Sequence, residues 1–248
     1  MAKRARRTKN QEHQDEGVIQ LNGMKRRQRY VTMIPKNLRQ EDYIEMLDDD
    51  RKYIVFAMGP AGTGKTLLAV LAAIRALKNG EIEKIVVTRP AVSVDEQHGF
   101  LPGTLEEKMA PWTRPIFDVF QEYFSPVQIE SMLADNIIEI APLAYMRGRT
   151  LAHCFAILDE AQNTTTEQMK MFLTRLGFSS KAVITGDVTQ IDLPRNKLSG
   201  LVEAVSALRD VQGIGMHFFS EKDVVRHPLV QSIVLAYKDH RGSRESRI

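Results

Sequence analysis

The segment that most constrains the fold of this chain is GPAGTGKT at residues 59–66, which lies between two apolar runs. The preceding run, YIVFAM at 53–58, is typical of a buried strand, and the following run, LLAVLAAIRAL at 67–77, favours a helix. A glycine-rich turn that joins a strand to a helix and ends in Gly-Lys-Thr is a phosphate-binding P-loop. Its backbone N–H groups surround phosphate oxygens at the positive end of the helix dipole.

The residues of this loop have separate expected roles. Lys65 is expected to reach the β- and γ-phosphates, and Thr66 to hold Mg²⁺. The rest of the loop is expected to contact phosphate through its backbone, and consists of Gly59, Pro60, Ala61, Gly62, Thr63 and Gly64.

Composition places the chain among ordinary globular proteins. It has 248 residues, of which 43% are hydrophobic and 26% charged. The apolar stretches are too short for a membrane span and the N-terminus is basic and polar, so we expect a cytoplasmic protein without a membrane partner. The single cysteine, Cys154, falls in an apolar run and is predicted to be a buried thiol.

Positive charge is concentrated at the two ends of the chain. The net charge is +3, but residues 1–29 carry +6 and residues 238–248 carry +2. We predict a disordered basic tail over 1–29, one folded domain over 30–237 and a basic tail over 238–248. The first tail can bind nucleic-acid phosphate without sequence preference, or it can simply be solvated.

Strand and helix patterns alternate along the domain. Strands are predicted at 53–58, 84–88, 137–140, 155–158, 181–185 and 216–219. Helices are predicted at 38–48, 65–77, 114–133, 164–176, 198–209 and 227–237, and a long loop with a short helix at 89–115. This alternation predicts a single α/β domain with a mainly parallel sheet flanked by helices.

Two further motifs follow predicted strands. Asp159 and Glu160 end the strand at 155–158, where Asp159 can orient the Mg²⁺ shell and Glu160 can act as general base for an attacking water. Asp187 and Gln190 follow the strand at 181–185. Gln190 can donate to a γ-phosphate or orient the water, and Asp187 can bridge to the Mg²⁺ side, although a plain Asx turn is the alternative.

Six segments together resemble the PhoH family of P-loop ATPases: GPAGTGKT, TRPAV, LAYMRGRT, ILDEAQN, TGDVTQID and DVVRHPLV. The resemblance runs from about residue 40 to residue 237, and two of the segments also resemble the core of superfamily 1 helicases. It implies one RecA-like ATPase domain, ATP and Mg²⁺ as ligands, and action on single-stranded nucleic acid, with RNA favoured. A superfamily 1 helicase has two such cores, whereas this chain has room for one.

The resemblance also assigns residues outside the three motifs. Gln40 and Tyr43 match the residues that contact adenine, although Gln40 can equally be a surface glutamine on an amphipathic helix. Arg226 matches an arginine that stabilises γ-phosphate charge. Since one core lacks a second domain to supply that arginine, we expect it to act across subunits in a homo-oligomer such as a hexamer. The alternative is a structural ion pair with Asp223 or Glu221.

Three arginines are candidates for nucleic-acid contact. Arg89 matches a helicase element that touches the nucleic-acid backbone, and Arg147 and Arg149 form a second basic pair. Trp112 can stack on a base. For each, a structural ion pair or packing of the long loop is the alternative.

The expected function is Mg²⁺-dependent ATP hydrolysis coupled to binding, translocation on or unwinding of single-stranded nucleic acid. The rival is an ATP-gated ring-forming scaffold that recruits an RNA-processing partner without unwinding. A small-molecule kinase is disfavoured, because ILDEAQN and the GDxxQ pattern of 186–190 are those of nucleic-acid motors.

Overall fold

A computed structural model describes residues 20–21, 24–25, 30–90, 105–194, 196–226, 228–230 and 232–233, with the side chains of 105–111 left out. The chain divides into two units, Met1–Tyr30 and Val31–Ile248. In the first unit, β1 (Gln20–Leu21) pairs antiparallel with β2 (Met24–Lys25). The remainder of the predicted tail over 1–29, and all of 238–248, lie outside the described residues.

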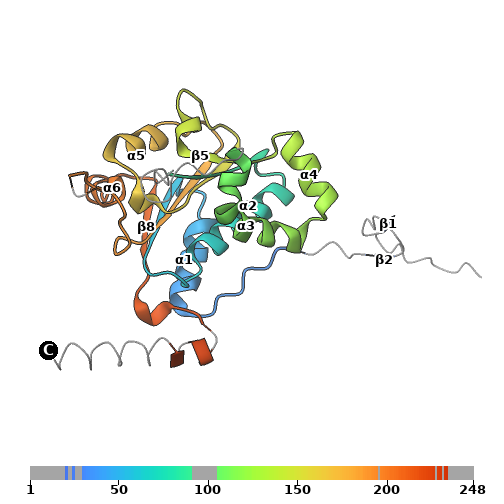
Figure 1. Ribbon diagram of the computed structural model, residues 1–248, viewed down its shortest axis with the longest axis horizontal. Helices are drawn as coiled ribbons and strands as arrows, with labels where there is room; N and C mark the ends of the chain where they lie inside the picture. The colour runs from blue at the N-terminus through green and yellow to red at the C-terminus, as the bar shows by residue number, and fades with distance from the viewer. Residues whose placement is uncertain are drawn as a thin grey trace, which may run out of the picture. The chain divides into compact units, whose positions relative to one another are not determined.

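The second unit is built on a six-stranded sheet with the strand order β5-β4-β6-β7-β3-β8 (Figure 1). Its strands are β3 (Ile54–Met58), β4 (Lys84–Arg89), β5 (Ile138–Pro142), β6 (Cys154–Leu158), β7 (Lys181–Gly186) and β8 (Ile214–Phe218). Every neighbouring pair in this sheet is parallel. The predicted α/β fold is confirmed, and the sheet is wholly rather than mainly parallel.

Helices cover both faces of the sheet, which is why its central strands are apolar throughout. One face packs against α1 (Leu38–Asp48), α2 (Lys65–Lys78), α3 (Leu105–Tyr123) and α4 (Pro126–Ala134). The other packs against the short helix η2 (Leu143–Met146), α5 (Thr166–Leu173) and α6 (Gly200–Ala207). Side chains of β3 alternate between these layers, with Val55 and Ala57 in the first and Phe56 and Met58 in the second.

The strand order brings the predicted motifs together. Strand β7 lies between β3, which leads into the P-loop, and β6, which leads into Asp159. This is the strand arrangement of a RecA-like P-loop domain. Because the strands are parallel, their carboxyl ends meet at one edge of the sheet, where ligands of open α/β sheets bind.

The segment predicted to be helical over 114–133 is helical, but it is divided between two helices. Helix α3 begins at Leu105, inside the segment expected to be a long loop with a short helix, and α4 is a separate helix. Ser125 caps α4 by accepting a hydrogen bond from the Gln128 backbone, Gln128 accepts one in return, and Pro126 fills the first helical position. This capping box starts a new helix where periodicity alone suggested a continuous one.

Shorter features complete the described chain. Cys154 is buried at the start of β6, as predicted. The short helices η3 (Ala161–Asn163) and η4 (Glu221–Asp223) follow β6 and β8. The predicted helix over 227–237 is described only at 228–230 and 232–233, which are helical. Within the described segments, the helices are too short or too polar to cross a membrane.

Candidate functional site

The P-loop connects β3 to α2 and requires glycine for conformational reasons. Gly64 caps α2 in the left-handed region, with φ of 85°, which side chains rarely adopt. At Gly59, φ is 144° and an added Cβ would lie 2.6 Å from the Phe219 carbonyl oxygen. The loop therefore packs closely on the segment after β8 and cannot take a larger residue there.

Lys65, the first residue of α2, lies inside the loop. It is 9% exposed, and its Nζ donates to the carbonyl oxygens of Gly59 at 2.6 Å and Pro60 at 2.8 Å. Burial lowers the pKa of Lys65, while the carboxylates of Asp187, Asp159 and Glu160 oppose this shift. A buried ammonium group within a glycine-rich loop is suited to binding phosphate.

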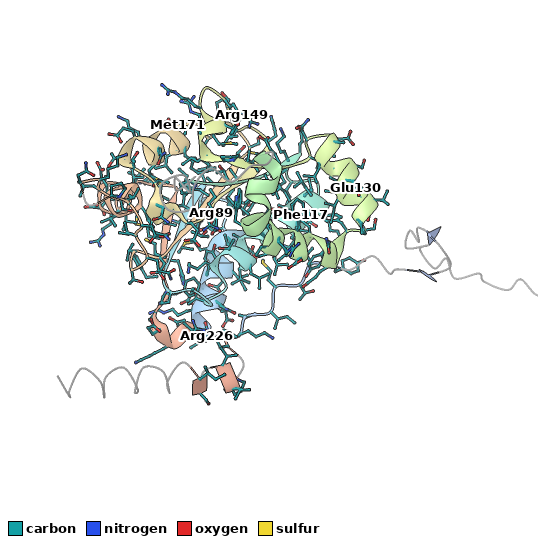
Figure 2. The ribbon with its side chains drawn as sticks, in the orientation of Figure 1. Arg89, Phe117, Glu130, Arg149, Met171 and Arg226 are labelled. Carbon is teal, nitrogen blue, oxygen red and sulfur yellow. The ribbon has the colours of Figure 1, made fainter. Side chains whose placement is uncertain are left out.

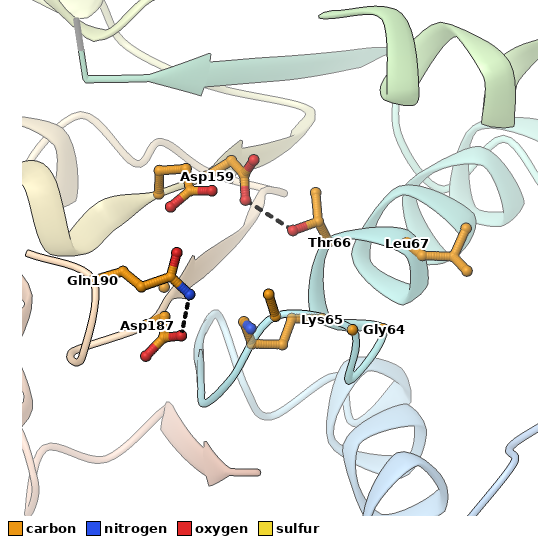
Figure 3. Close-up of a pocket in the computed structure, with 11 residues that line it drawn as sticks. Gly64, Lys65, Thr66, Leu67, Asp159, Asp187 and Gln190 are labelled. Carbon is orange, nitrogen blue, oxygen red and sulfur yellow. Dashed lines mark hydrogen bonds between the residues drawn. The ribbon is translucent and has the colours of Figure 1, made fainter. Parts of the chain in front are cut away.

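Asp159 is held between two hydroxyl groups. Thr66 Oγ1 donates to Asp159 Oδ1 at 2.8 Å (Figure 3). Thr185 Oγ1 donates to the same oxygen at 2.6 Å. Hydroxyl and carboxylate oxygens are the ligands that Mg²⁺ prefers, so this group fits the expected magnesium site. Sequence reasoning missed Thr185, although its place at the end of β7, two residues before Asp187, was an available signal.

Glu160 follows Asp159 in an unusual backbone conformation. Its φ of 51° lies in the left-handed region, which costs a non-glycine residue of the order of 1 kcal/mol. Its Oε2 accepts a hydrogen bond from Gln162 Nε2 at 2.6 Å, and its Oε1 lies 3.7 Å from Arg89 Nη2. Both oxygens of the expected general base are therefore engaged.

Gln190 is held by Asp187 on the opposite side of the site. Gln190 Nε2 donates to Asp187 Oδ2 at 2.6 Å (Figure 3). Thr189 donates to Asp187 Oδ1 through its backbone and its hydroxyl. Burial raises the pKa of Asp187, but these hydrogen bonds outweigh it and the pKa lies below its ordinary value. Asp187 is thus a charged acceptor that fixes the Gln190 side chain.

Gln162 is a site residue that sequence reasoning missed. Its side chain is 1% exposed; it donates to Glu160 Oε2 and, at 3.2 Å, to the Gln190 carbonyl, and it accepts from the Asp187 backbone N–H at 3.0 Å. One buried amide therefore joins the turn after β6 to the loop after β7. The available signal was the polar pair Gln162-Asn163, which directly follows Asp159-Glu160-Ala161. Two amide side chains beside such a motif indicate hydrogen bonds to it.

These groups surround one pocket of about 280 Å³ (Figure 3). Nine of the predicted site residues line it: Ala61, Gly62, Gly64, Lys65, Thr66, Asp159, Glu160, Asp187 and Gln190. Leu67 and Gly186 complete the lining.

The two predicted adenine contacts lie beneath the loop. Gln40 is 5% exposed, its Nε2 donates to the Thr63 carbonyl at 2.9 Å, and its Oε1 accepts from the Lys36 backbone. Tyr43 is fully buried, stacks on His217 and donates to the Lys65 carbonyl at 3.3 Å. Burial raises the pKa of Tyr43 far above its ordinary range. Gln40 is thus not the surface glutamine of the alternative, both residues brace the P-loop, and their contact with adenine stays a prediction.

Arg226 lies against the P-loop of its own chain. Its Nη2 donates to the Ala61 carbonyl at 3.4 Å, and the neighbouring Val225 N–H donates to the Gly62 carbonyl at 2.9 Å. Asp223, the partner considered in the alternative, accepts hydrogen bonds from Ser220. Arg226 is exposed, so its expected action on a neighbouring subunit stays a prediction.

The other basic candidates are spread over the molecule. Arg149 forms a bidentate ion pair with Glu139, and Figure 2 shows it far from Arg226. Arg147 is exposed at the end of η2. Trp112 is a residue of α3 rather than of a loop, and it is half-buried against the core. Of these candidates, Arg89 is the one that the structure places beside a residue lining the pocket, through its ion pair with Glu160.

Comparison with known proteins agrees with the geometry of the P-loop site. A family model described as PhoH-like protein matches residues 32–238. The chain belongs to the PhoH-like family. This PhoH-like chain is 55% identical over 202 residues to the PhoH-like protein of Bacillus subtilis (strain 168), covering 82% of this chain and 63% of that protein. It is 41% identical over 224 residues to Protein PhoH of Escherichia coli (strain K12), covering 89% and 63%.

The chain thus spans about three-fifths of the length of these two relatives. Among solved structures, the UvsW helicase from bacteriophage T4 aligns with a TM-score of 0.45 and 16% identity, over 75% of this chain and 60% of that one. The family match and the residues that line the pocket agree on a P-loop of the kind that binds nucleotides.

Proposed function

We propose that this chain hydrolyses ATP in a Mg²⁺-dependent reaction that is coupled to binding, or movement along, single-stranded nucleic acid, with RNA favoured. The observation that carries the proposal is the convergence of Lys65, the Thr66–Asp159 pair and Glu160 on one pocket. A phosphate-binding lysine, a metal-holding pair and a general base are the groups that hydrolysis of a phosphoanhydride requires.

The side chains divide the work of this reaction. Glu160 would take the proton of the attacking water, and Lys65 would neutralise charge that builds up on the phosphate oxygens. Gln190, fixed by Asp187, would contact the γ-phosphate or the water. Bound Mg²⁺, held by Thr66 and Asp159, would supply further positive charge at the phosphate.

Three features support nucleic acid as the partner. Arg89 lies at the sheet edge beside the pocket, Arg147 is exposed, and residues 1–29 add a charge of +6. Arginine binds phosphate bidentately, and basic segments raise affinity for any nucleic-acid strand. We further propose a homo-oligomer, with a hexamer as the first candidate, in which exposed Arg226 serves a γ-phosphate of its own or a neighbouring P-loop.

The test is steady-state ATP hydrolysis with and without single-stranded RNA or DNA, together with molar mass on the same sample. We expect stimulation by one nucleic acid from an oligomer. Glu160→Gln should lower kcat by roughly 10²–10⁴-fold while nucleotide binding is kept, and Lys65→Ala should abolish nucleotide binding. Exposed Glu167→Gln, on α5, is the matched charge control. ATP binding with turnover indifferent to both nucleic acids would instead favour the ATP-gated scaffold.

A further inference from the structure

We propose that Arg89 and Glu160 form a latch, in which Arg89 holds the general base until a nucleic-acid phosphate draws the guanidinium away. We call this ion pair the Arg89–Glu160 latch. The proposal rests on the ATP hydrolysis proposed above and names its regulation.

The latch is a product of strand pairing. Strands β4 and β6 are neighbours, with Thr88 paired to Leu158, and the Asp159 N–H donates to the Thr88 carbonyl at 2.9 Å. Arg89 and Glu160 are the residues that follow these paired backbone groups. Their side chains meet beyond the carboxyl ends of β4 and β6, with Arg89 Nη2 and Glu160 Oε1 3.7 Å apart (Arg89 is labelled in Figure 2).

The latch occupies the oxygen that a general base needs. Glu160 Oε2 is taken by Gln162, which is buried and belongs to the same turn, so that contact is fixed by the fold. Oε1 faces Arg89. A carboxylate that is to accept a proton from water must present a lone pair to that water, and here the remaining oxygen is turned to a guanidinium. Release of Arg89 frees Oε1 and leaves the Gln162 contact in place.

The contact with Arg89 is the one that can break. The two side chains are 31% and 36% exposed and their charged atoms are 3.7 Å apart, and half-exposed ion pairs of this length contribute little free energy. A weak contact can be outcompeted by a better partner. Arg89 is the last residue of β4, is partly exposed and does not line the pocket, so its guanidinium is accessible to a ligand that binds outside the pocket.

A nucleic-acid strand supplies the competing charge. Guanidinium groups bind phosphate in a planar, bidentate geometry, which is stronger than a single long contact to a carboxylate. Because Arg89 cannot serve the phosphate and Glu160 equally, binding outside the pocket is coupled to the state of the base inside it. Such coupling is reciprocal: if RNA frees Glu160, removal of the Glu160 charge must strengthen RNA binding.

The first experiment reads the latch without hydrolysis. Binding of a fluorescent single-stranded oligouridylate is measured by anisotropy, in the absence of nucleotide, for the wild-type chain, Glu160→Gln, Arg89→Ala and the double variant. We expect Glu160→Gln to bind about fivefold more tightly, and the gain to vanish in the Arg89→Ala background. Arg89→Ala should also reduce the slope of log Kd against log salt by about 0.7, the value for one phosphate contact on a single strand.

The second experiment measures whether Arg89 restrains Glu160, through the rate of ATP hydrolysis. Without nucleic acid, Arg89→Ala should hydrolyse ATP about fivefold faster than the wild-type chain, with KM unchanged, and should lose the same factor of stimulation by RNA. Arg89→Lys keeps the charge and should keep the stimulation. Arg51→Ala is the matched control, because Arg51 pairs with Asp49 before β3, at the opposite end of the strands, and should leave the basal rate unchanged.

Distinct results overturn the latch and the hydrolysis proposal. If Glu160→Gln binds RNA no better than the wild-type chain, or its gain persists without Arg89, the latch is wrong whatever the hydrolysis assay gives. Where the wild-type chain does hydrolyse ATP, a basal rate of Arg89→Ala that stays at or below the wild-type value also overturns the latch, since ATP itself or a structural role would then account for the ion pair. Coupling in the binding experiment without any ATP turnover would support the latch and remove the proposed hydrolysis.

Discussion

Replacing Gln162 by leucine is expected to damage stability and turnover together. Leucine has a similar volume, so the substitution removes hydrogen bonds without leaving a large cavity. The Asp187 N–H, in a residue that is 6% exposed, loses its acceptor, at a cost of about 1–3 kcal/mol. The lost bond to the half-exposed Glu160 adds about 1 kcal/mol, because water replaces part of it. The expected loss is therefore roughly 2–4 kcal/mol.

The measurement is urea unfolding, with thermal unfolding alongside. In a domain of about 200 residues, a loss of 3 kcal/mol lowers Tm on the order of 10 °C. We also expect kcat for ATP to fall more than KM changes, since Gln162 orients Glu160 and does not line the pocket.

Gln168→Leu is the matched control for this substitution. Gln168 makes a local capping pair with Thr165, and its loss should cost less than about 1 kcal/mol. A Gln162→Leu protein within about 0.5 kcal/mol of the wild-type chain, with unchanged kcat, would show that Gln162 is not the connection inferred here.

Two further predictions concern ionisation. Because burial lowers the pKa of Lys65 below 10.5, the unfolded chain binds its proton more readily, so stability should rise as pH rises towards 10.5. In Lys65→Met, the urea midpoint should no longer rise with pH, stability near neutral pH should increase, and nucleotide binding should be lost. If the urea midpoint of Lys65→Met varied with pH as in the wild-type chain, the prediction would be contradicted. The pKa of Asp187 is held below 3.8, so its contribution is present above pH 3.8 and is lost as pH falls below that value. Asp187→Asn should be less stable than the wild-type chain at pH 7, with the deficit closing in acid; a deficit that persists there would refute the role of the charge.

The parts of the fold that sequence predicted well are those fixed by local pattern. The strand before GPAGTGKT, the helix after it and the buried strand before Asp159 follow from runs of apolar residues, and the structure has all three. The missed break at Ser125-Pro126 also had a local signal, since both capping residues are visible in the sequence. That capping box divides the helical segment predicted over 114–133 into two helices.

The sequence did not predict which side chains from different elements contact one another. Residues 89 and 160 are ordinary ends of two apolar strands, and only the pairing of β4 with β6 makes them an ion pair. Arg149 shows the same limit, because it lies in the segment after η2 whereas its partner Glu139 is on β5. The roles of the pocket residues followed from residue type at strand ends, whereas the contacts that orient them depend on which strands are neighbours.

The bracing of the P-loop has a consequence for the order of folding events. The loop is supported by Gln40 and Tyr43 from α1, and α1 is tied to the far end of the domain by the hydrogen bond from Asn37 Nδ2 to the Asp223 carbonyl, 186 residues away in sequence. Contacts of such separation form late, because a long stretch of chain must first be closed. Because the Val225 N–H also donates to the Gly62 carbonyl of the P-loop, we expect this loop to reach its final shape late in folding, although its eight residues are contiguous. A chain still emerging during synthesis would carry the complete motif well before the loop has its final shape.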